Sequence, residues 1–156
     1  LEKFPSHEMM LRCFPEHAER NVILGADSLI GDPLTPSHWT LYPFRAISVD
    51  RLFEMIDFMV YFVVPTWRES FGRVLAEGVA AGKIVITDPA TAEAFDGAVI
   101  GARPEEIDGI IQAYINEPGR YVSDVLAAQE KLAQFSSSAF EDMIAPIVAN
   151  AMEHTA

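Results

Sequence analysis

Four short segments that are apolar along their whole length constrain the fold most. They are NVILGA (21–26), DFMVYFVV (57–64), KIVIT (83–87) and GAVIGA (97–102), and each has the length of a β-strand. Strands buried on both faces are typical of parallel sheets covered by helices, whereas antiparallel strands more often alternate apolar and polar residues. The sequence therefore predicts an α/β fold with a doubly wound parallel sheet.

Segments with helical spacing separate these strands and follow the last one. The predicted helices span residues 6–14, 49–56, 70–82, 104–116, 121–135 and 136–154, with an interruption near Pro146. Ser6 is the predicted N-cap of the first helix. Residues 27–44, rich in Gly, Pro and Asp, are predicted to form a long loop. Ligands of such folds bind at the carboxyl ends of the strands, which here lie after Ala26, Val64 and Thr87.

Chain length, charge and cysteine content narrow the class of protein. The 156 residues are predicted to form a single domain, 1–156. Eleven basic and 23 acidic residues give a net charge of −12, which argues against a broad nucleic-acid-binding face. The single cysteine, Cys13, excludes an internal disulfide and is predicted to be a buried structural thiol. This cysteine content favours a reducing compartment, and no secretory signal is visible, so we expect the cytoplasm. No residue cluster has the spacing of a metal site.

The stretch PTWRESFGRVLAE, residues 65–77, carries the candidate chemistry. It leads from a predicted strand into a predicted helix, whose first N–H groups and dipole suit a phosphate. Gly72 lets a ligand approach the backbone closely. Glu69 and Glu77 lie eight residues apart, which is roughly 12 Å along a helix. A nucleotide sugar fits this order, with its sugar at Glu69, its diphosphate at the helix start and its ribose at Glu77.

Spacing alone leaves plainer interpretations open. Two glutamates eight residues apart occur by chance in many helices, and Ser70 is equally suited to be a simple N-cap. Arg68 and Arg73 either assist a diphosphate or are solvated residues at the helix end. In the loop before residue 49, Trp39 and Tyr42 either stack on a nucleobase or pack in the core.

The stretch from residue 65 to residue 88 resembles the E-x7-E signature of retaining glycosyltransferases with the two-domain GT-B fold. This large family includes sucrose synthases and bacterial mannosyl- and glucosyltransferases. The matching positions are Pro65, Glu69, Phe71, Gly72, Glu77, Ala80, Gly82, Val85 and Ile86. Lys83 and Gly78 depart from the family's usual proline and alanine. The order of elements suits the C-terminal, donor-binding half of such an enzyme, a Rossmann-like domain with closing helices.

The resemblance implies a role for each matching residue. Glu69, the implied catalytic residue, contacts the hydroxyls of the donor sugar. The backbone around Ser70, Phe71 and Gly72 binds the sugar and the diphosphate, and Glu77 holds the ribose. The implied reaction moves a hexose from a nucleotide diphosphate sugar to an acceptor with retention. Neither a cofactor nor an essential metal is expected.

The resemblance also implies partners outside the chain. Family members use an arginine and a lysine after the first strand of this domain to bind the diphosphate. Lys3 is the candidate lysine, and a solvated terminal residue is the alternative. The arginine and an acceptor-binding N-terminal domain would then precede this chain, so the isolated chain is expected to bind its donor and transfer nothing. Family members often touch membranes through that other half.

A nucleotide- or phosphate-binding α/β module without transferase activity is the competing hypothesis, because the same helix N-terminus would serve it. Neither G-x-G-x-x-G nor G-x-x-x-x-G-K-[ST] occurs, which counts against ordinary dinucleotide-binding and P-loop folds. A third hypothesis is an interaction protein with a vestigial site. The intact Glu69, Gly72 and Glu77 count against that one.

Overall fold

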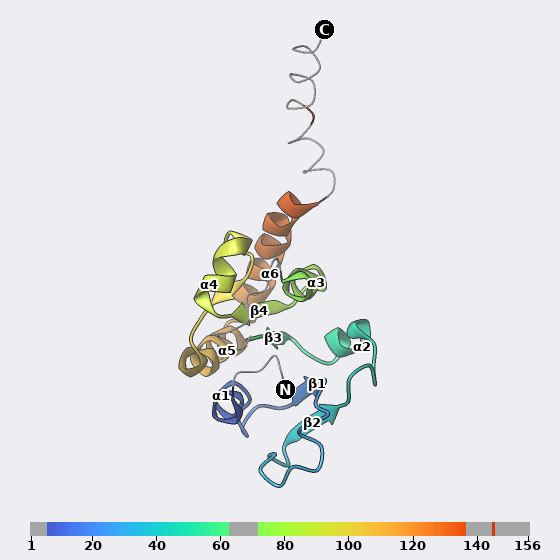
Figure 1. Cartoon of the computed structure of the whole chain (residues 1–156). Helices are drawn as coiled ribbons and strands as arrows, with labels where there is room; N and C mark the ends of the chain where they lie inside the picture. The colour runs from blue at the N-terminus through green and yellow to red at the C-terminus, as the bar shows by residue number, and fades with distance from the viewer. Residues whose placement is uncertain (1–5, 63–71, 137–144, 146–156) are drawn as a thin grey trace.

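A computed structural model describes residues 6–62, 72–136 and 145 and shows a mixed α/β fold (Figure 1). The strands are β1 (Asn21–Leu24), β2 (Trp39–Tyr42), β3 (Phe58–Val60), β4 (Ile84–Thr87) and β5 (Ile100–Gly101). The helices are α1 (His7–Cys13), α2 (Val49–Glu54), α3 (Arg73–Ala80), α4 (Pro89–Ala92), α5 (Ile107–Asn116) and α6 (Pro118–Leu132). Short 3-10 turns follow α4 and α6 and precede α5.

All strand pairs of the described residues are parallel, as predicted. β1 pairs with β2 from Asn21 opposite Trp39 onward. β4 lies between β3 and β5, with Val85 opposite Met59 and Ile86 opposite Ile100. Within the described ranges these pairs form two small sheets, one of two strands and one of three. The doubly wound arrangement goes beyond what these two sheets show.

Helices cover both faces of the three-stranded sheet, which confirms that part of the prediction. Met59 and Val85 face a cluster formed with α2, α3 and the segment around α4. Ile84 and Ile86 face the opposite way, into a cluster formed with α1 and α5. Figure 1 shows α3 and α4 on one side of β4 and α5 on the other. Alternate residues of one strand therefore enter separate cores, which is why these strands read as apolar throughout.

Helix α1 joins the two-stranded sheet to the rest of the core. Its residue Met10 packs with Ile23 and Trp39 of β1 and β2. Cys13, one turn further on, packs in the cluster with α5 instead. The predicted N-cap is confirmed, because the Ser6 hydroxyl accepts a hydrogen bond of 3.1 Å from the Met9 N–H.

Two elements were missed by the sequence analysis. Residues 39–42 belong to the segment predicted as a long loop, and they instead form β2. Their sequence WTLY is rich in aromatic and β-branched residues, a signal outweighed by the surrounding Gly and Pro. Helix α4 was also not predicted. Asp88 caps its N-terminus and Pro89 occupies its first turn, a typical helix-start pair in a helix of only four residues.

Several predicted elements are shorter than expected. β3 covers three residues of the predicted strand 57–64, and only Met59 among them is buried, so its complete burial was wrong. β5 covers two residues of the predicted strand 97–102. The last two residues of the predicted strand 57–64 lie outside the described residues. The same holds for the predicted helix 136–154, of which only Ser136 and Ala145 are described.

Close packing around Gly78 explains why a glycine stands where the motif usually has alanine. This glycine lies where α3 packs on the sheet, and a Cβ at this position would lie 2.7 Å from Met59 Sδ and 2.9 Å from Val85 Cγ2. We expect Gly78→Ala to lower the free energy of unfolding by about 1–3 kcal/mol, because overpacking outweighs the gain of about 1 kcal/mol in helix propensity. Urea unfolding of the two proteins measures the difference.

Gly109→Ala is the matched control. Gly109 also lies inside a helix, α5, but a Cβ there meets no atom within 4 Å. This substitution should therefore raise stability by about 0.5–1 kcal/mol through helix propensity alone. If Gly78→Ala were as stabilising as Gly109→Ala, the close packing of α3 on β3 and β4 would be contradicted.

Candidate functional site

The predicted donor-site residues divide into those that the structure describes and those that it does not. Gly72, Arg73 and Glu77 are described and lie together at α3. The other predicted residues lie outside the described ranges, and they are Lys3, Arg68, Glu69, Ser70 and Phe71. The geometry of the site is therefore built from α3 and from the carboxyl ends of β3 and β4.

Gly72 is the N-cap of α3, and Ser70, the alternative cap, lies outside the described residues. Gly72 has the left-handed conformation, with φ 65° and ψ 49°, and its carbonyl accepts a 2.8 Å hydrogen bond from the Leu75 N–H. A Cβ at this position would also lie 3.0 Å from Leu75 Cδ1. The glycine thus has a conformational reason to be present in addition to any ligand. No side chain among the described residues caps this helix.

Glu77 and Arg73 form an ion pair on α3. Arg73 Nε lies 3.2 Å from Glu77 Oε1, one helical turn further along. The Arg73 side chain is 89% exposed and that of Glu77 is 41% exposed. The pair is therefore solvated and easily opened, and the Glu77 carboxylate is reachable by a ligand that runs along α3.

The carboxyl ends of β3 and β4 are joined by a buried side chain. Thr87, the last residue of β4, is 1% exposed, and its hydroxyl donates a hydrogen bond of 2.5 Å to the Tyr61 carbonyl. The next residue, Asp88, accepts a 3.0 Å hydrogen bond from the Thr91 N–H and caps α4. Asp88 is thus a structural acid at this edge of the sheet.

Trp39 is a core residue rather than a free surface for a nucleobase. It is 6% exposed, and its indole N–H donates a 3.0 Å hydrogen bond to the Phe14 carbonyl. The core-packing interpretation is confirmed for this residue. Tyr42, at the end of β2, is half-buried, with its hydroxyl 4.0 Å from Met55 Sδ.

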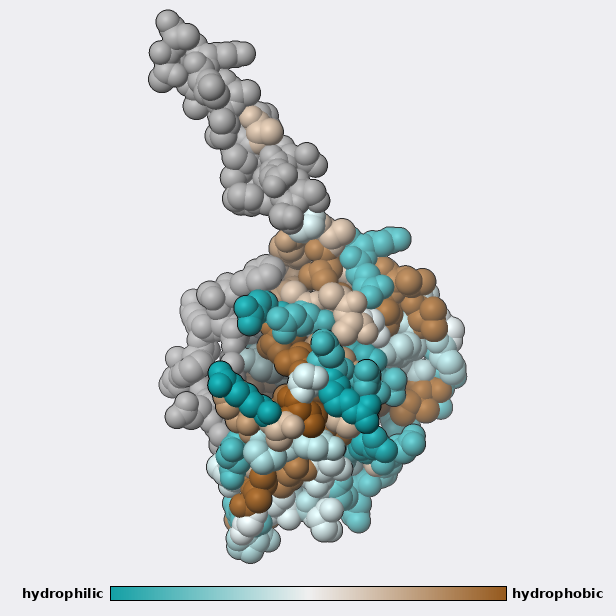
Figure 2. Space-filling model, turned by 90° about the vertical axis from the view of Figure 1, so that its right-hand side faces the viewer, coloured by the Kyte–Doolittle hydropathy of each residue, from teal (hydrophilic) through white to brown (hydrophobic). Residues whose placement is uncertain are grey.

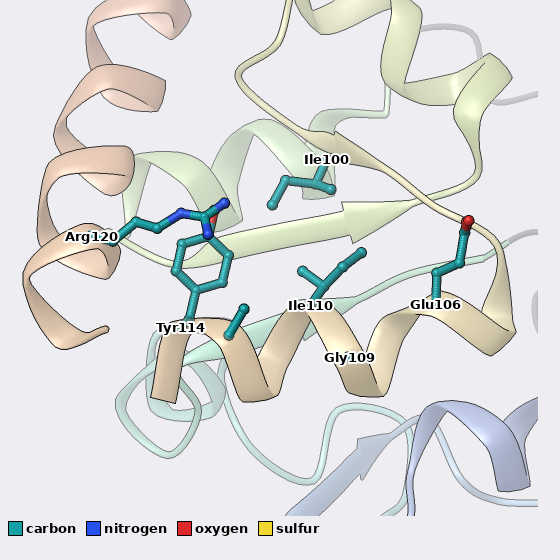
Figure 3. A pocket seen from close by; sticks show the side chains of 7 residues that line it. Ile100, Glu106, Gly109, Ile110, Tyr114 and Arg120 are labelled. Carbon is teal, nitrogen blue, oxygen red and sulfur yellow. The ribbon is translucent and has the colours of Figure 1, made fainter. Parts of the chain in front are cut away.

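An open groove of about 590 Å³ lies along β5, between α5 and α6 (Figure 3). Ile100 and Ile110 line its apolar floor, and Arg120 from α6 lies over the Tyr114 ring, 5.0 Å from its centroid. No sequence motif indicates this groove, because its lining residues come from β5, α5, α6 and the 3-10 turn before α5.

The Arg120 end of the groove lies at the amino ends of the strands. The next residue of α6, Tyr121, has one hydroxyl proton, which the carbonyls of Asp57 (2.9 Å) and Gly82 (3.3 Å) share. Asp57 and Gly82 precede β3 and β4 respectively. The groove lies on the face of the sheet that α5 covers, where Ile100, Ile110 and Tyr114 pack, whereas α3 packs on the opposite face. The groove is therefore separate from the predicted donor site.

Burial shifts two groups near the sheet toward their neutral forms. It raises the pKa of Tyr114 to about 12, with a further contribution from Asp124, which accepts a 2.9 Å hydrogen bond from the Tyr114 hydroxyl. Burial likewise raises the pKa of the Cys13 thiol to about 12. Cys13 is 2% exposed, so the prediction of a buried structural thiol is confirmed.

The visible surface is mixed rather than dominated by one kind of side chain. Figure 2 shows hydrophilic side chains interspersed with small apolar patches. Among the described residues, no helix has the length and apolar character needed to span a membrane. In the same ranges, no group of three or more His, Cys, Asp or Glu side chains is placed to hold a metal ion.

Comparisons with known proteins give no match: no family model matches the chain, and no curated protein or solved structure is significantly similar to it. The glycosyltransferase resemblance is therefore carried by the motif residues alone, and the function has to be argued from the site.

The raised pKa of Tyr114 predicts how stability changes in alkali. In the unfolded chain a tyrosine loses its proton near pH 10, whereas in the folded protein Tyr114 keeps it until about pH 12. This contribution to stability is complete below about pH 10 and is lost as the pH rises toward 12. Urea unfolding at a series of alkaline pH values should show this fall. Tyr114→Phe should show a shallower fall, and an equal slope would contradict the assignment.

Proposed function

We propose that this chain is the donor-binding domain of a retaining glycosyltransferase that moves a hexose from a nucleotide diphosphate sugar to an acceptor. One observation carries the proposal: Glu77 lies accessible on α3, one turn beyond a helix start that Gly72 leaves without a side-chain cap. The motif places Glu69 just before that start. The proposal includes the finer fold, a doubly wound sheet forming the Rossmann-like half of a GT-B enzyme.

The geometry of α3 supports this use. The helix begins at Arg73, and Gly72 presents no side chain that would compete with a ligand for its first N–H groups. Glu77 lies five positions after Gly72, a rise of roughly 7–8 Å along a helix. That distance suits a phosphate at the helix start and a ribose hydroxyl at the Glu77 carboxylate.

Each proposed site residue has a distinct task. Glu69 accepts hydrogen bonds from the sugar hydroxyls at the reacting end of the donor. The backbone of Ser70, Phe71 and Gly72 receives the sugar and the diphosphate. Glu77 accepts from the ribose. Lys3 and Arg73 supply positive charge for the diphosphate, and Arg73 already lies beside Glu77 at 3.2 Å.

Calorimetric titration tests the nucleotide half of the site. We expect the chain to bind one of UDP, GDP or ADP, and its glucose conjugate, in preference to the others. Glu77→Ala should weaken this binding by about tenfold or more, because a charge-assisted hydrogen bond contributes about 1.5–3 kcal/mol. Glu54→Ala, which changes an exposed glutamate of α2, is the control and should leave binding unchanged. A folded wild-type protein that binds none of these ligands would contradict the proposal.

Glu69→Gln separates a transferase donor site from a bare nucleotide-binding module. It should weaken binding of the nucleotide sugar more than binding of the corresponding nucleoside diphosphate, because only the sugar contacts Glu69. Equal effects on the two ligands would favour the module without transferase activity. Both can be measured in the same titration series.

A further inference from the structure

We propose that β5 is a docking edge for an extended peptide, which adds a strand to the sheet and places alternate side chains in the groove beside α5. The peptide has its carboxyl terminus at the Arg120 end of the groove and a basic side chain at the Glu106 end. The inference goes beyond the proposed function and does not depend on it. It is carried by the unpaired backbone of Gly101 together with the groove of about 590 Å³.

Gly101 presents its backbone polar groups to solvent at the edge of the sheet. Among the described residues, β5 pairs with β4 alone, as the last strand in the order β3-β4-β5. On that inner side, the Ala102 N–H donates a 2.9 Å hydrogen bond to the Thr87 carbonyl. Since successive residues of a strand point their N–H and C=O groups to opposite sides, those of Gly101 point outward. Gly101 is exposed, and no other described residue bonds its N–H or C=O.

An exposed edge of this kind can take up a further strand, because its free N–H and C=O groups match those of another extended chain. In a strand added beside β5, every second side chain would lie on the same face of the sheet as Ile100. The groove lies on this face, and in Figure 3 Ile110 and Tyr114 of α5 face Ile100 across it. Apolar side chains of the added strand would therefore be buried between β5 and α5.

The two ends of the groove carry opposite charges. At the carboxyl end of β5, Glu105 and Glu106 share one guanidinium, that of Arg103, at 3.5 and 2.9 Å, so this end has a net negative charge. At the other end, Arg120 is exposed, and its Nε lies 3.4 Å from Asp124 Oδ2. A guanidinium has five N–H donors, so this single long contact leaves donors for a second carboxylate.

These charges set the direction and length of the peptide. A chain that runs antiparallel to β5 has its carboxyl terminus at Arg120 and its amino-terminal side at Glu106. The eight positions from Glu106 to Tyr114 cover roughly 12 Å along a helix, which is the length of about four extended residues. The groove therefore suits a short peptide with a basic residue, apolar residues at alternate positions and a free carboxyl terminus.

A second copy of the chain and a small apolar ligand fit the groove less well. Two chains that each carry a net charge of −12 repel one another. An apolar ligand would cover Ile100 and Ile110 but would leave the N–H and C=O groups of Gly101 without partners. An extended peptide satisfies the strand edge, the apolar floor and both charged ends.

NMR titration tests the inference with a short synthetic peptide that has an N-terminal lysine, alternating valine and threonine residues and a free carboxyl terminus. The peptide should shift the amide signals of residues 100–102. It should also slow hydrogen exchange of the Gly101 amide, because this N–H gains an acceptor. Amidation of the carboxyl terminus should weaken binding about tenfold, the effect of one charge-assisted hydrogen bond. Arg120→Ala should bind both forms of the peptide as weakly as the wild-type protein binds the amidated form.

Gly109→Lys blocks the groove and has a matched control. Gly109 lines the groove, and a Cβ there meets no atom within 4 Å, so lysine adds a side chain to the groove without a clash and raises helix propensity. We expect this variant to bind the peptide at least about tenfold more weakly. Gly119→Lys adds the same charge at a helical position of α6 that is equally open and does not line the groove. It should leave binding unchanged.

Each other outcome overturns the inference in a recognisable way. A folded wild-type protein whose signals at residues 100–102 do not shift binds no peptide at this edge. Shifts without slower exchange at Gly101 would mean that the peptide fills the groove as an apolar ligand and adds no strand. Self-association in light scattering that Gly109→Lys abolishes would assign the edge to a second copy of the chain. None of these measurements involves a nucleotide, so the proposed function stands or falls separately.

Discussion

Burial of β4 on both of its faces is the constraint on which the rest of the structure depends. All four of its residues are buried, and it is the strand that pairs with both β3 and β5. Val85 enters one core and Ile84 and Ile86 enter the other. Helices must therefore cover both sides, and the close packing of α3 at Gly78 follows from this. β3 pairs with β4, and α3 packs on Val85 of β4, so this one strand fixes the positions of both elements.

The parts of the fold that could be predicted are those with a strong local pattern. The segment KIVIT has no polar residue between Lys83 and Thr87, and its predicted strand is confirmed as β4. Ser6 before an apolar helical run became an N-cap. β2 was missed because the surrounding Gly and Pro outweighed the strand propensity of its four residues. Its pairing with β1 joins residues 18 positions apart, as in Asn21 opposite Trp39, and no pattern within one segment indicates such a pairing.

The candidate site was predictable only in part, for a related reason. The ion pair of Arg73 and Glu77 follows from their four-residue spacing on a helix. The left-handed conformation of Gly72 does not, since a glycine is compatible with many conformations. The hydrogen bond from Thr87 to Tyr61 joins residues 26 positions apart. No pattern within one segment reveals such a bond, because it exists only once the register of β3 on β4 is set.

The charge of the protein and the charge of its proposed ligand have to be reconciled, because a net charge of −12 repels a diphosphate. Charges separated by more than about 8–10 Å are largely screened at physiological ionic strength, so the groups nearest the helix start decide the outcome. Among the residues that the structure describes, these groups include the first N–H groups of α3 and the guanidinium of Arg73. Arg73 is 89% exposed and its pair with Glu77 is solvated, so separating the two costs little. On the proposed function, a donor that places its ribose on Glu77 and its diphosphate near Arg73 replaces this ion pair with two charge-assisted contacts. The ion pair of Arg73 and Glu77 then holds both side chains beside α3 in the absence of ligand. In this way a protein with a net negative charge can bind a diphosphate at the start of α3.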